Sequence, residues 1–359
     1  MSRGDNGEGD RSDSDLDIVD CDIHIGMPSE EFVADHLPPR YAERGVTLPM
    51  PGYAHPHGRV MDNDEQEGGT TPEKTADYHL DRHGIDRGIV TASTLLLASS
   101  IHPNRDYAGE LAALGNAYLD EEWLGHDDRL YGSVLVPPTN VERAVSLVEE
   151  YGDRDDFVQV VMGSACEQAY GNPRFWPIYE AAAERDLPVA IHTGNDGAGV
   201  SNPVGQGNPS NYFEWHNAFP QTYMSHVNSL IVEGVFEEFP ELTFVCIEGG
   251  FAWAPHLMWR MDKNWRGLRD QAPWLDEPPS YYFENNVRFT TQPVPEPESP
   301  EHLIHLLDMM HAEETLMFAS DYPPWDVDDP DFVLPSGVDE ALERRVFAGN
   351  ALDAYDFPA

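Results

Sequence analysis

The sequence of 359 residues contains little lysine, few cysteines and no long hydrophobic segment. Its 21 basic residues face 65 acidic ones, which gives a formal net charge of −44, and only Lys74 and Lys263 are lysines. A broad basic surface for nucleic acid is therefore excluded, and an anionic membrane would repel the protein. An excess of carboxylates with so little lysine is typical of proteins from salt-loving organisms, where concentrated ions screen the repulsion between like charges.

The three cysteines, Cys21, Cys166 and Cys246, are too few and too widely spaced for a disulfide framework or a paired-cysteine metal site. No apolar run reaches the ~18 residues of a membrane span. Residues 1–14 are polar and acidic, so they do not resemble a signal peptide and we expect a disordered tail. These features together predict a soluble cytoplasmic protein.

After this tail, short apolar segments alternate with longer stretches that have a helical period. Eight segments are expected to be strands: Leu16–Ile25, Gly88–Leu97, Leu130–Val136, Phe157–Met162, Pro188–His192, Leu242–Glu248, Val287–Thr291 and Thr315–Ser320. Eight are expected to be helices: Glu73–His83, Asp106–Leu124, Asn140–Tyr151, Arg174–Arg185, Met224–Phe239, Ala254–Leu268, Glu301–His311 and Val338–Tyr355. The alternation predicts one α/β domain over residues 15–359, a (β/α)₈ TIM barrel, with a doubly wound open sheet as the alternative.

Two loop insertions interrupt the alternation, at residues 28–72 and 194–222. Both follow predicted strands, and loops after strands lie at the catalytic end of a barrel. The second insertion is rich in aromatic residues and is expected to pack as a lid or wall of the site.

Polar residues at the ends of four predicted strands indicate a metal site. Asp22 and His24 share one face of the first strand, because alternate residues of a strand point the same way. His192 ends the fifth strand, Glu248 ends the sixth, and Asp321 follows the eighth. In a barrel these ends converge on one mouth, where two imidazoles and carboxylates suit one divalent ion, Zn²⁺ in preference to Mn²⁺.

The sequence also resembles the amidohydrolase-related family of the amidohydrolase superfamily, the group that includes aminocarboxymuconate-semialdehyde decarboxylase. The segments that carry the resemblance are VDCDIHIG at 19–26, LDRHGIDRGIV at 80–90, NPRFWPIYEAAAERDLPVAIHTG at 172–194, GVFEEFPELTFVCIEGGFAW at 234–253, FASDYPPWD at 318–326 and RVFAGNALDAYDF at 345–357. The resemblance implies a barrel with a single metal ion held by Asp22, His24, His192 and Asp321. It also implies catalytic roles for Asp321 and Glu248.

Two positions depart from the family pattern. Many members carry histidine at the end of the sixth strand, where this chain has Glu248, and many carry histidine where this chain has Pro324. A mechanism that depends on a histidine at position 248 or 324 therefore cannot operate in this chain. A carboxylate at position 248 can still relay protons.

Other polar residues are weaker candidates. Arg174, Arg260 and Arg288 are candidates to bind a substrate carboxylate, and Trp215, His216 and His226 are candidates to face the pocket. The pairs His55 and His57, His79 and His83, and His302 and His305 could chelate a metal, but a loop position or a helix away from the mouth argues against each.

Three functions are compatible with these residues. The first is a metal-dependent decarboxylase of a small unsaturated or aromatic carboxylic acid. The second is a metal-dependent hydrolase of an amide, ester or lactone, which would use the same residues. The third is a barrel that binds a small molecule without turnover. The family resemblance also makes a homodimer possible.

Overall fold

The centre of the molecule is a sheet of eight parallel strands, arranged in the order of the sequence from β1 to β8. The computed structural model describes residues 16–43, 71–93, 96–202 and 207–358. The strands are β1 (Val19–His24), β2 (Arg87–Thr91), β3 (Leu130–Leu135), β4 (Phe157–Gly163), β5 (Val189–His192), β6 (Phe244–Ile247), β7 (Val287–Thr290) and β8 (Leu316–Met317). The expected acidic tail and the pair His55 and His57 lie outside the described residues.

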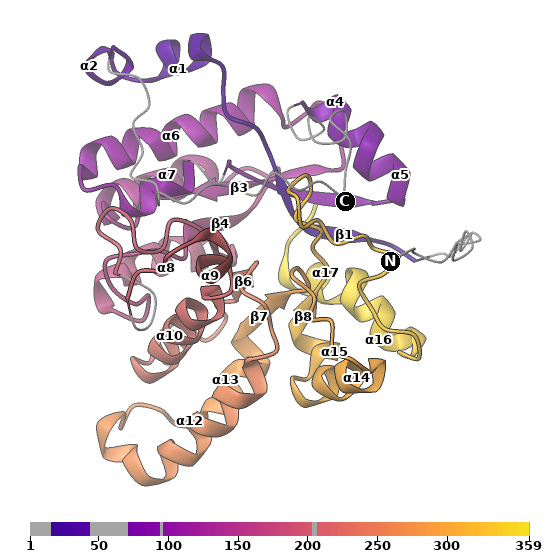
Figure 1. Ribbon diagram of the computed structural model, residues 1–359. Coiled ribbons are helices and arrows are strands. Elements are labelled where there is room, and N and C mark those ends of the chain that lie inside the picture. Colours follow the sequence, from indigo (N-terminus) through magenta and orange to yellow (C-terminus); the bar gives the residue numbers. More distant parts are fainter. Residues whose placement is uncertain (1–15, 44–70, 94–95, 203–206, 359) are drawn as a thin grey trace.

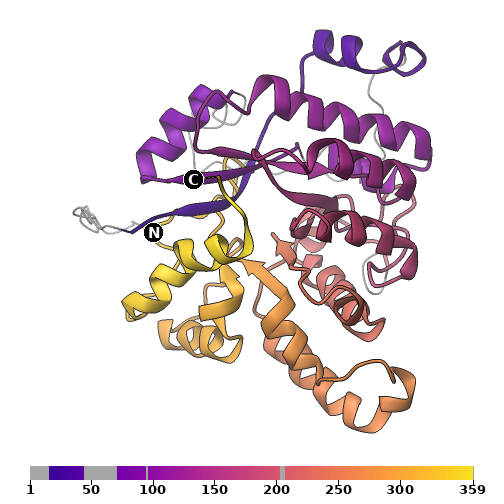
Figure 2. The same cartoon turned by 180° about the vertical axis from the view of Figure 1, so that it is seen from behind.

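The chain after β8 returns to β1 and closes the barrel. The backbone N–H of Cys21 donates to the carbonyl of Phe318 at 3.0 Å, and that of His24 donates to the carbonyl of Tyr322 at 2.8 Å. Ile23 and Tyr322 form a parallel bridge at the same seam. The helices surround the strands in both views (Figures 1 and 2). The predicted (β/α)₈ TIM barrel is confirmed, and the open-sheet alternative is wrong because β1 and the segment after β8 are joined.

Helices connect the strands on the outside of the barrel. Their bounds are α1 (Glu30–His36), α2 (Pro39–Ala42), α4 (Pro72–Thr75), η2 (Ala76–Leu80), α5 (Asp81–His83), η3 (Leu96–Ile101), α6 (Arg105–Glu122), α7 (Val141–Tyr151), η4 (Pro173–Phe175), α8 (Trp176–Ala183), α9 (Tyr212–His216), α10 (Phe219–Val232), α11 (Val235–Glu238), α12 (Ala254–Leu268), η5 (Arg269–Gln271), α13 (Pro279–Asn286), α14 (Pro300–Met309), α15 (Ala312–Thr315), α16 (Glu340–Arg344), η6 (Arg345–Gly349) and α17 (Asn350–Ala354). Among the described residues, no helix is both long enough and apolar enough to cross a membrane.

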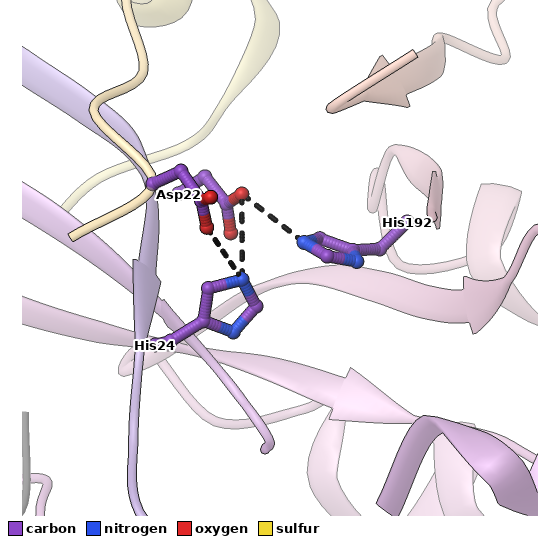
Figure 3. Close-up of side chains that lie close together, drawn as sticks. Asp22, His24 and His192 are labelled. Carbon is purple, nitrogen blue, oxygen red and sulfur yellow. Dashed lines mark hydrogen bonds and ion pairs between the residues drawn. The ribbon is translucent and has the colours of Figure 1, made fainter. Parts of the chain in front are cut away.

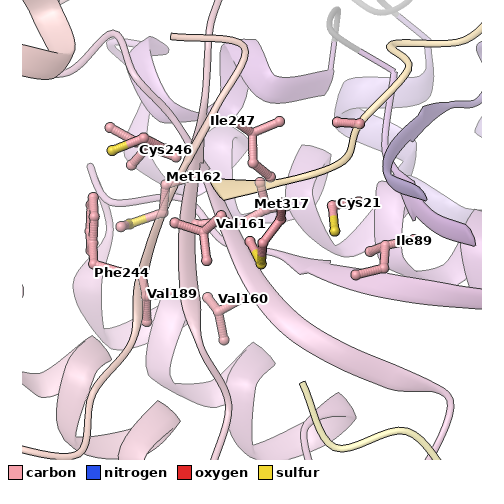
Figure 4. Packing of buried hydrophobic residues seen from close by; sticks show 14 of the residues in the cluster. Cys21, Ile89, Val160, Val161, Met162, Val189, Phe244, Cys246, Ile247 and Met317 are labelled. Atoms are coloured by element: carbon pink, nitrogen blue, oxygen red, sulfur yellow. The ribbon is translucent and has the colours of Figure 1, made fainter. Parts of the chain in front are cut away.

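The core lies inside the barrel and between the strands and the helices. All residues of β1, β3, β4, β5 and β6 are buried. Figure 4 shows side chains of several strands packed together, among them Val161, Ile247 and Met317. Parallel strands covered on both faces are expected to be continuously apolar, which explains why they were recognisable in the sequence. The polar residues at their ends are the exception.

The insertion at 194–222 is partly helical. It contains α9, and α10 begins at Phe219, five residues before the predicted start at Met224. Pro220 lies in the first turn of α10, where proline is tolerated because its missing N–H would have no partner there. The insertion therefore carries its own ordered elements to the mouth of the barrel.

Candidate functional site

Four residues from β1, β5 and the segment after β8 form a buried group that we call the inner cluster: Asp22, His24, His192 and Asp321. One ligand atom of each lies within 4.8 Å of the others. Figure 3 shows the side chains of Asp22, His24 and His192 turned toward one another. The Nε2 atom of His24 is 3.0 Å from Oδ1 of Asp321, and that of His192 is 3.2 Å from Oδ2 of Asp22. The structure thus brings together all four predicted metal ligands.

The strand ends aim these side chains into the mouth. Asp22 and His24 are alternate residues of β1, and His192 is the last residue of β5. Glu248 directly follows β6 and Asp321 lies beyond β8, and both have left-handed backbone conformations, with φ of 56° and 58°. Such a φ is unfavourable for residues other than glycine, and it concentrates at functional sites.

Several polar atoms of the inner cluster have no hydrogen-bond partner although they are buried. These atoms are Oδ1 of Asp22, both ring nitrogens of His24, and Oδ1 of Asp321. A buried polar atom without a partner normally costs about 1–3 kcal/mol, so it indicates a missing ligand. Bonds of about 2.0–2.2 Å to one ion would separate neighbouring ligand atoms by about 2.8–3.6 Å. The contacts of 3.0 Å and 3.2 Å fit this range.

His192 is oriented for metal binding by its own backbone. Its Nδ1–H donates to the carbonyl of Thr193 at 2.8 Å, which directs Nε2 toward Asp22 at 3.2 Å. A second hydrogen bond from a ring N–H is the usual way in which proteins fix a metal-binding histidine. The donor set of two imidazoles and two carboxylates therefore fits a first-row divalent ion.

The charged groups of the inner cluster shift one another's pKa values. Burial alone would raise the pKa of Asp22, but the nearby His192 and His24 outweigh burial and lower it. Burial lowers the pKa of His24 to about 4. Burial also acts to lower the pKa of His192, but Asp22 outweighs it and raises this pKa to about 9. A metal ion would have to displace that proton from His192.

Two carboxyl groups at the mouth resist ionisation. Burial, followed by repulsion from Glu248, Asp326 and Asp22, raises the pKa of Asp321 well above its ordinary value. Burial also raises the pKa of Glu248, although His192 partly offsets this rise. A bound cation would relieve the repulsion in both cases. Groups with such perturbed pKa values are candidates for proton transfer.

Three further polar residues lie at the mouth of the barrel: His216, Asp326 and Gln292. The pattern of polar residues at strand ends did not predict a catalytic or metal-binding role for them. His216 on α9 and Asp326 after β8 lie 3.2 Å apart between Nε2 and Oδ2. Gln292 after β7 donates from Nε2 to Oδ2 of Asp321 and to Oδ2 of Asp326, both at 3.3 Å. His216 was a weak candidate, and Asp326 ends the segment FASDYPPWD, but nothing in their spacing predicted this contact.

A hydrogen-bonded network behind the inner cluster fixes β1 against the segment after β8. Asp20 accepts a hydrogen bond from the hydroxyl of Ser320 at 2.5 Å and lies 2.7 Å from Nε2 of His79. Its other oxygen accepts from the backbone N–H groups of Ser320 and Asp22. His79 also stacks on Tyr322. The network therefore holds the two segments that supply Asp22 and Asp321, and His79 faces Asp20 rather than the metal ligands.

The predicted substrate-binding residues do not join the inner cluster. Arg174 pairs with Glu167 at 2.9 Å, and Arg260 is exposed on α12. Trp215 is buried and donates from Nε1 to the carbonyl of Asp196.

Two remaining candidates have structural contacts of their own. His226 donates from Nε2 to the carbonyl of Ser164 at 2.7 Å and accepts from the N–H of Tyr170. It lines a separate cavity of about 360 Å³. Arg288 donates to the backbone carbonyls of Glu284 and Val287. These hydrogen bonds join His226 and Arg288 to the backbone of neighbouring segments. The two residues therefore stabilise the fold in this structure.

Comparison with known proteins places this geometry in a family. The family model described as amidohydrolase matches residues 19–357. No curated protein matches the chain significantly. A dihydroxybenzoic acid decarboxylase from a Polaromonas species, solved with bound manganese and the inhibitor 2-nitroresorcinol, is 19% identical, with a TM-score of 0.68 over 94% of this chain and 96% of the other.

Two further solved structures have the same fold. An amidohydrolase from Mycobacterium avium subsp. paratuberculosis has a TM-score of 0.73 and 18% identity, covering 95% of this chain and 99% of the other. A 5-carboxyvanillate decarboxylase from Sphingomonas paucimobilis has a TM-score of 0.69 and 18% identity, covering 96% of this chain and all (100%) of the other. Since the family model spans nearly the whole sequence and the barrel carries the expected ligand cluster, the chain belongs to the amidohydrolase family.

Proposed function

We propose that the protein is a metal-dependent decarboxylase of an aromatic carboxylic acid. The observation that carries the proposal is the inner cluster, whose buried ligand atoms lack hydrogen-bond partners at the mouth of the barrel. The decarboxylases of similar fold, which act on dihydroxybenzoate and 5-carboxyvanillate, support this choice over hydrolysis. We infer that the substrate is a benzoate with a hydroxyl group on its ring.

In this proposal Asp22, His24, His192 and Asp321 hold one divalent ion. When bound, the ion would neutralise the substrate carboxylate and an adjacent oxygen and so bring an anion to this acidic site. The ligand set suits both Zn²⁺ and Mn²⁺. The manganese in a neighbour favours Mn²⁺ as the first ion to test.

In this proposal Asp321 supplies the proton. Gln292 fixes its Oδ2, while Oδ1 faces the centre of the inner cluster. Asp321 would protonate the ring carbon that bears the carboxylate, the bond to the carboxylate would break, and its electron pair would return to the ring as CO₂ leaves. Water would then return a proton to Asp321, and the hydroxide that remains would combine with the released CO₂ to give bicarbonate. A positioned acid contributes typically about 10²–10⁴-fold to a rate.

An aromatic wall beside the cluster supports a planar substrate. Tyr212 stacks with His216, their ring centroids 5.5 Å apart, and Trp325 donates from Nε1 to the hydroxyl of Tyr212. The ring of Phe219 also contacts His216, with the ring centroids 5.1 Å apart. Offset contacts with such rings stabilise a bound aromatic ring by about 0.5–1.5 kcal/mol each.

The experiment is a product assay on a panel of hydroxybenzoates with the Mn²⁺-loaded and Zn²⁺-loaded protein. We expect release of CO₂ and the matching phenol, and a rate lower by about 10²–10⁴-fold in Asp321→Asn. Asp308→Asn, an exposed carboxylate on α14, is the matched control and should keep the full rate. Release of a cleaved acid from amide, ester or lactone substrates, without CO₂, would contradict decarboxylation and support hydrolysis.

We also propose adaptation to concentrated salt and a reducing cytoplasm. The charge of −44 supports the first, and the free cysteines Cys21, Cys166 and Cys246 are compatible with the second. Screening of like charges should then raise the unfolding midpoint as KCl is added. A midpoint that falls with salt would contradict the salt adaptation.

A homodimer is the proposed assembly. Helix α12 projects from the barrel in both views (Figures 1 and 2), and large apolar side chains on and near it are exposed: Trp259, Leu268, Trp274 and Tyr281. An exposed patch of this kind is typical of a surface that binds another protein chain. Light scattering should give the mass of a dimer, and Trp259→Glu should shift it toward the monomer.

A further inference from the structure

A second group of ligand-type residues adjoins the inner cluster. We call His216, Glu248 and Asp326 the outer cluster. Their ligand atoms lie within 4.8 Å of one another. Nε2 of His216 is 3.2 Å from Oδ2 of Asp326 and 3.8 Å from Oε1 of Glu248. The residues come from α9, the end of β6 and the segment after β8, so three separate elements converge on one point.

Glu248 belongs to the outer cluster and also contacts one member of the inner cluster. Its Oε2 lies 3.4 Å from Nε2 of His192, while its Oε1 lies nearest to His216. A carboxylate that offers one oxygen to each of two ligand groups is suited to bridge two cations, which in two-metal sites lie about 3.5–4 Å apart. The side chain is only 8% exposed, so water does not screen it well.

The charges favour two cations over one. Four carboxylates meet at the mouth, namely Asp22, Glu248, Asp321 and Asp326, and one divalent ion balances only half of their charge. A carboxylate substrate would add another negative charge. A second divalent ion would balance the four carboxylates, so that a substrate carboxylate would meet no net repulsion at the mouth.

The outer cluster is also held in place before any ion binds. The ring of His216 contacts the rings of Tyr212, Phe219 and Trp325. Gln292 donates to the side-chain and backbone oxygens of Asp326. Fixed ligands lose little conformational entropy when a metal binds, which is the condition for a preformed site.

We propose that the outer cluster binds a second divalent cation of the Mn²⁺ or Zn²⁺ class, with Glu248 as the bridge between the two ions. The proposal rests on the proposed metal site in the inner cluster. His216 and Asp326 are the ligands specific to the second ion. An occupied outer site would place a positive charge against the aromatic wall, where the carboxylate of an aromatic substrate can approach.

The test is the number of ions bound per chain in the full-length protein. The protein is loaded with Mn²⁺, dialysed against excess Mg²⁺ to remove ions from the acidic surface, and analysed by mass spectrometry of the metal. We expect two Mn²⁺ ions per chain in the wild type and one in His216→Ala and in Asp326→Asn. His36→Ala is the control, because His36 pairs with Glu121 and belongs to neither cluster. This variant should still bind two Mn²⁺ ions per chain.

Electron paramagnetic resonance of the Mn²⁺-loaded wild type gives an independent measurement that needs no variant. Two ions bridged by Glu248 should give a spin-coupled spectrum, and Asp326→Asn should convert it to that of isolated Mn²⁺. Circular dichroism and thermal unfolding show whether each variant is folded. If His216→Ala does not fold, Asp326→Asn and the wild-type spectrum still decide the question.

The outcomes separate the two proposals. One ion per chain with an isolated-ion spectrum would overturn the second site and leave the proposed decarboxylase intact. No ion after dialysis would overturn both. Two ions that persist in His216→Ala and Asp326→Asn would contradict the assignment of the outer cluster as the second site.

Discussion

Asp196 provides a test of the structure that is independent of any metal. It lies after β5 with only 3% of its surface exposed, and it lines the cavity that also contains His226. Its carboxyl accepts hydrogen bonds from Thr222 at 2.9 Å and from Ser164 at 3.4 Å. Burial outweighs these bonds and raises its pKa from 3.8 to about 6. Asp196 therefore keeps its proton up to a higher pH in the folded protein than in the unfolded chain.

The sign of the pH dependence follows from proton binding. Between these two pKa values the folded chain binds a proton that the unfolded chain has lost, so stability falls as the pH rises. The contribution of Asp196 to the free energy of unfolding is complete below its pKa in the unfolded chain. It is lost as the pH rises through its pKa in the folded protein. The full shift corresponds to about 3 kcal/mol, of which about 1.4 kcal/mol is lost between about pH 5 and about pH 8.

Asp196→Asn removes this titration while it keeps the size of the side chain. Urea unfolding of the wild type and the variant should be compared from about pH 5 to about pH 8 at constant salt. We expect the variant to gain about 1.4 kcal/mol relative to the wild type over this range, because the other carboxylates cancel in the difference. Asp308→Asn is the exposed control and should show no such trend. A difference that is constant with pH, or that has the opposite sign, would refute the reasoning.

Three further perturbations test other parts of the account. Asp20→Asn weakens the network behind the inner cluster and should lower metal affinity by about 10–100-fold in a metal titration, whereas unchanged affinity would show that this network does not orient the ligands. Gly249→Ala would place a Cβ 2.5 Å from the buried ring of Tyr223 and should lower stability by about 1–3 kcal/mol in thermal unfolding; an unchanged midpoint would contradict the packing. Arg174→Ala breaks a surface pair with Glu167 and should change stability by no more than about 1 kcal/mol and leave KM unchanged, and a large rise in KM would restore its predicted role in substrate binding.

The barrel was predictable because its strands are buried on both faces. The segment Phe157–Met162 was expected and β4 is Phe157–Gly163, while Pro188–His192 was expected and β5 is Val189–His192. Two expected strands were too long. The expected strand Gly88–Leu97 was wrong beyond Thr91, where β2 ends, and Leu96 begins the helix η3. Segment Thr315–Ser320 reduces to β8 at Leu316–Met317, because the chain beyond it pairs with β1 rather than with β7 alone.

The inner cluster could be found from sequence because strand ends of a barrel meet at one mouth. To identify its members it was enough to know where each residue lies relative to a predicted strand: Asp22, His24, His192 and Asp321. His216 and Asp326 lie on loop elements, and their contact depends on how the insertion folds over the barrel. Local periodicity carries no information about such packing between distant segments.

The arginines show the opposite error. Arg174 was selected because arginine suits a carboxylate and lysine is scarce, but in a chain with 65 acidic residues most arginines find a carboxylate on the surface. Residue type alone therefore could not separate a substrate ligand from an ion pair of the fold.

The most direct test of the central claim is CO₂ release by the wild-type protein before and after removal of its metal. The account predicts that the Mn²⁺-loaded protein releases CO₂ from a hydroxybenzoate, that chelation abolishes this activity, and that added Mn²⁺ restores it. Activity that survives complete removal of the metal, or a metal-loaded protein that releases no CO₂ from any hydroxybenzoate, would contradict the account.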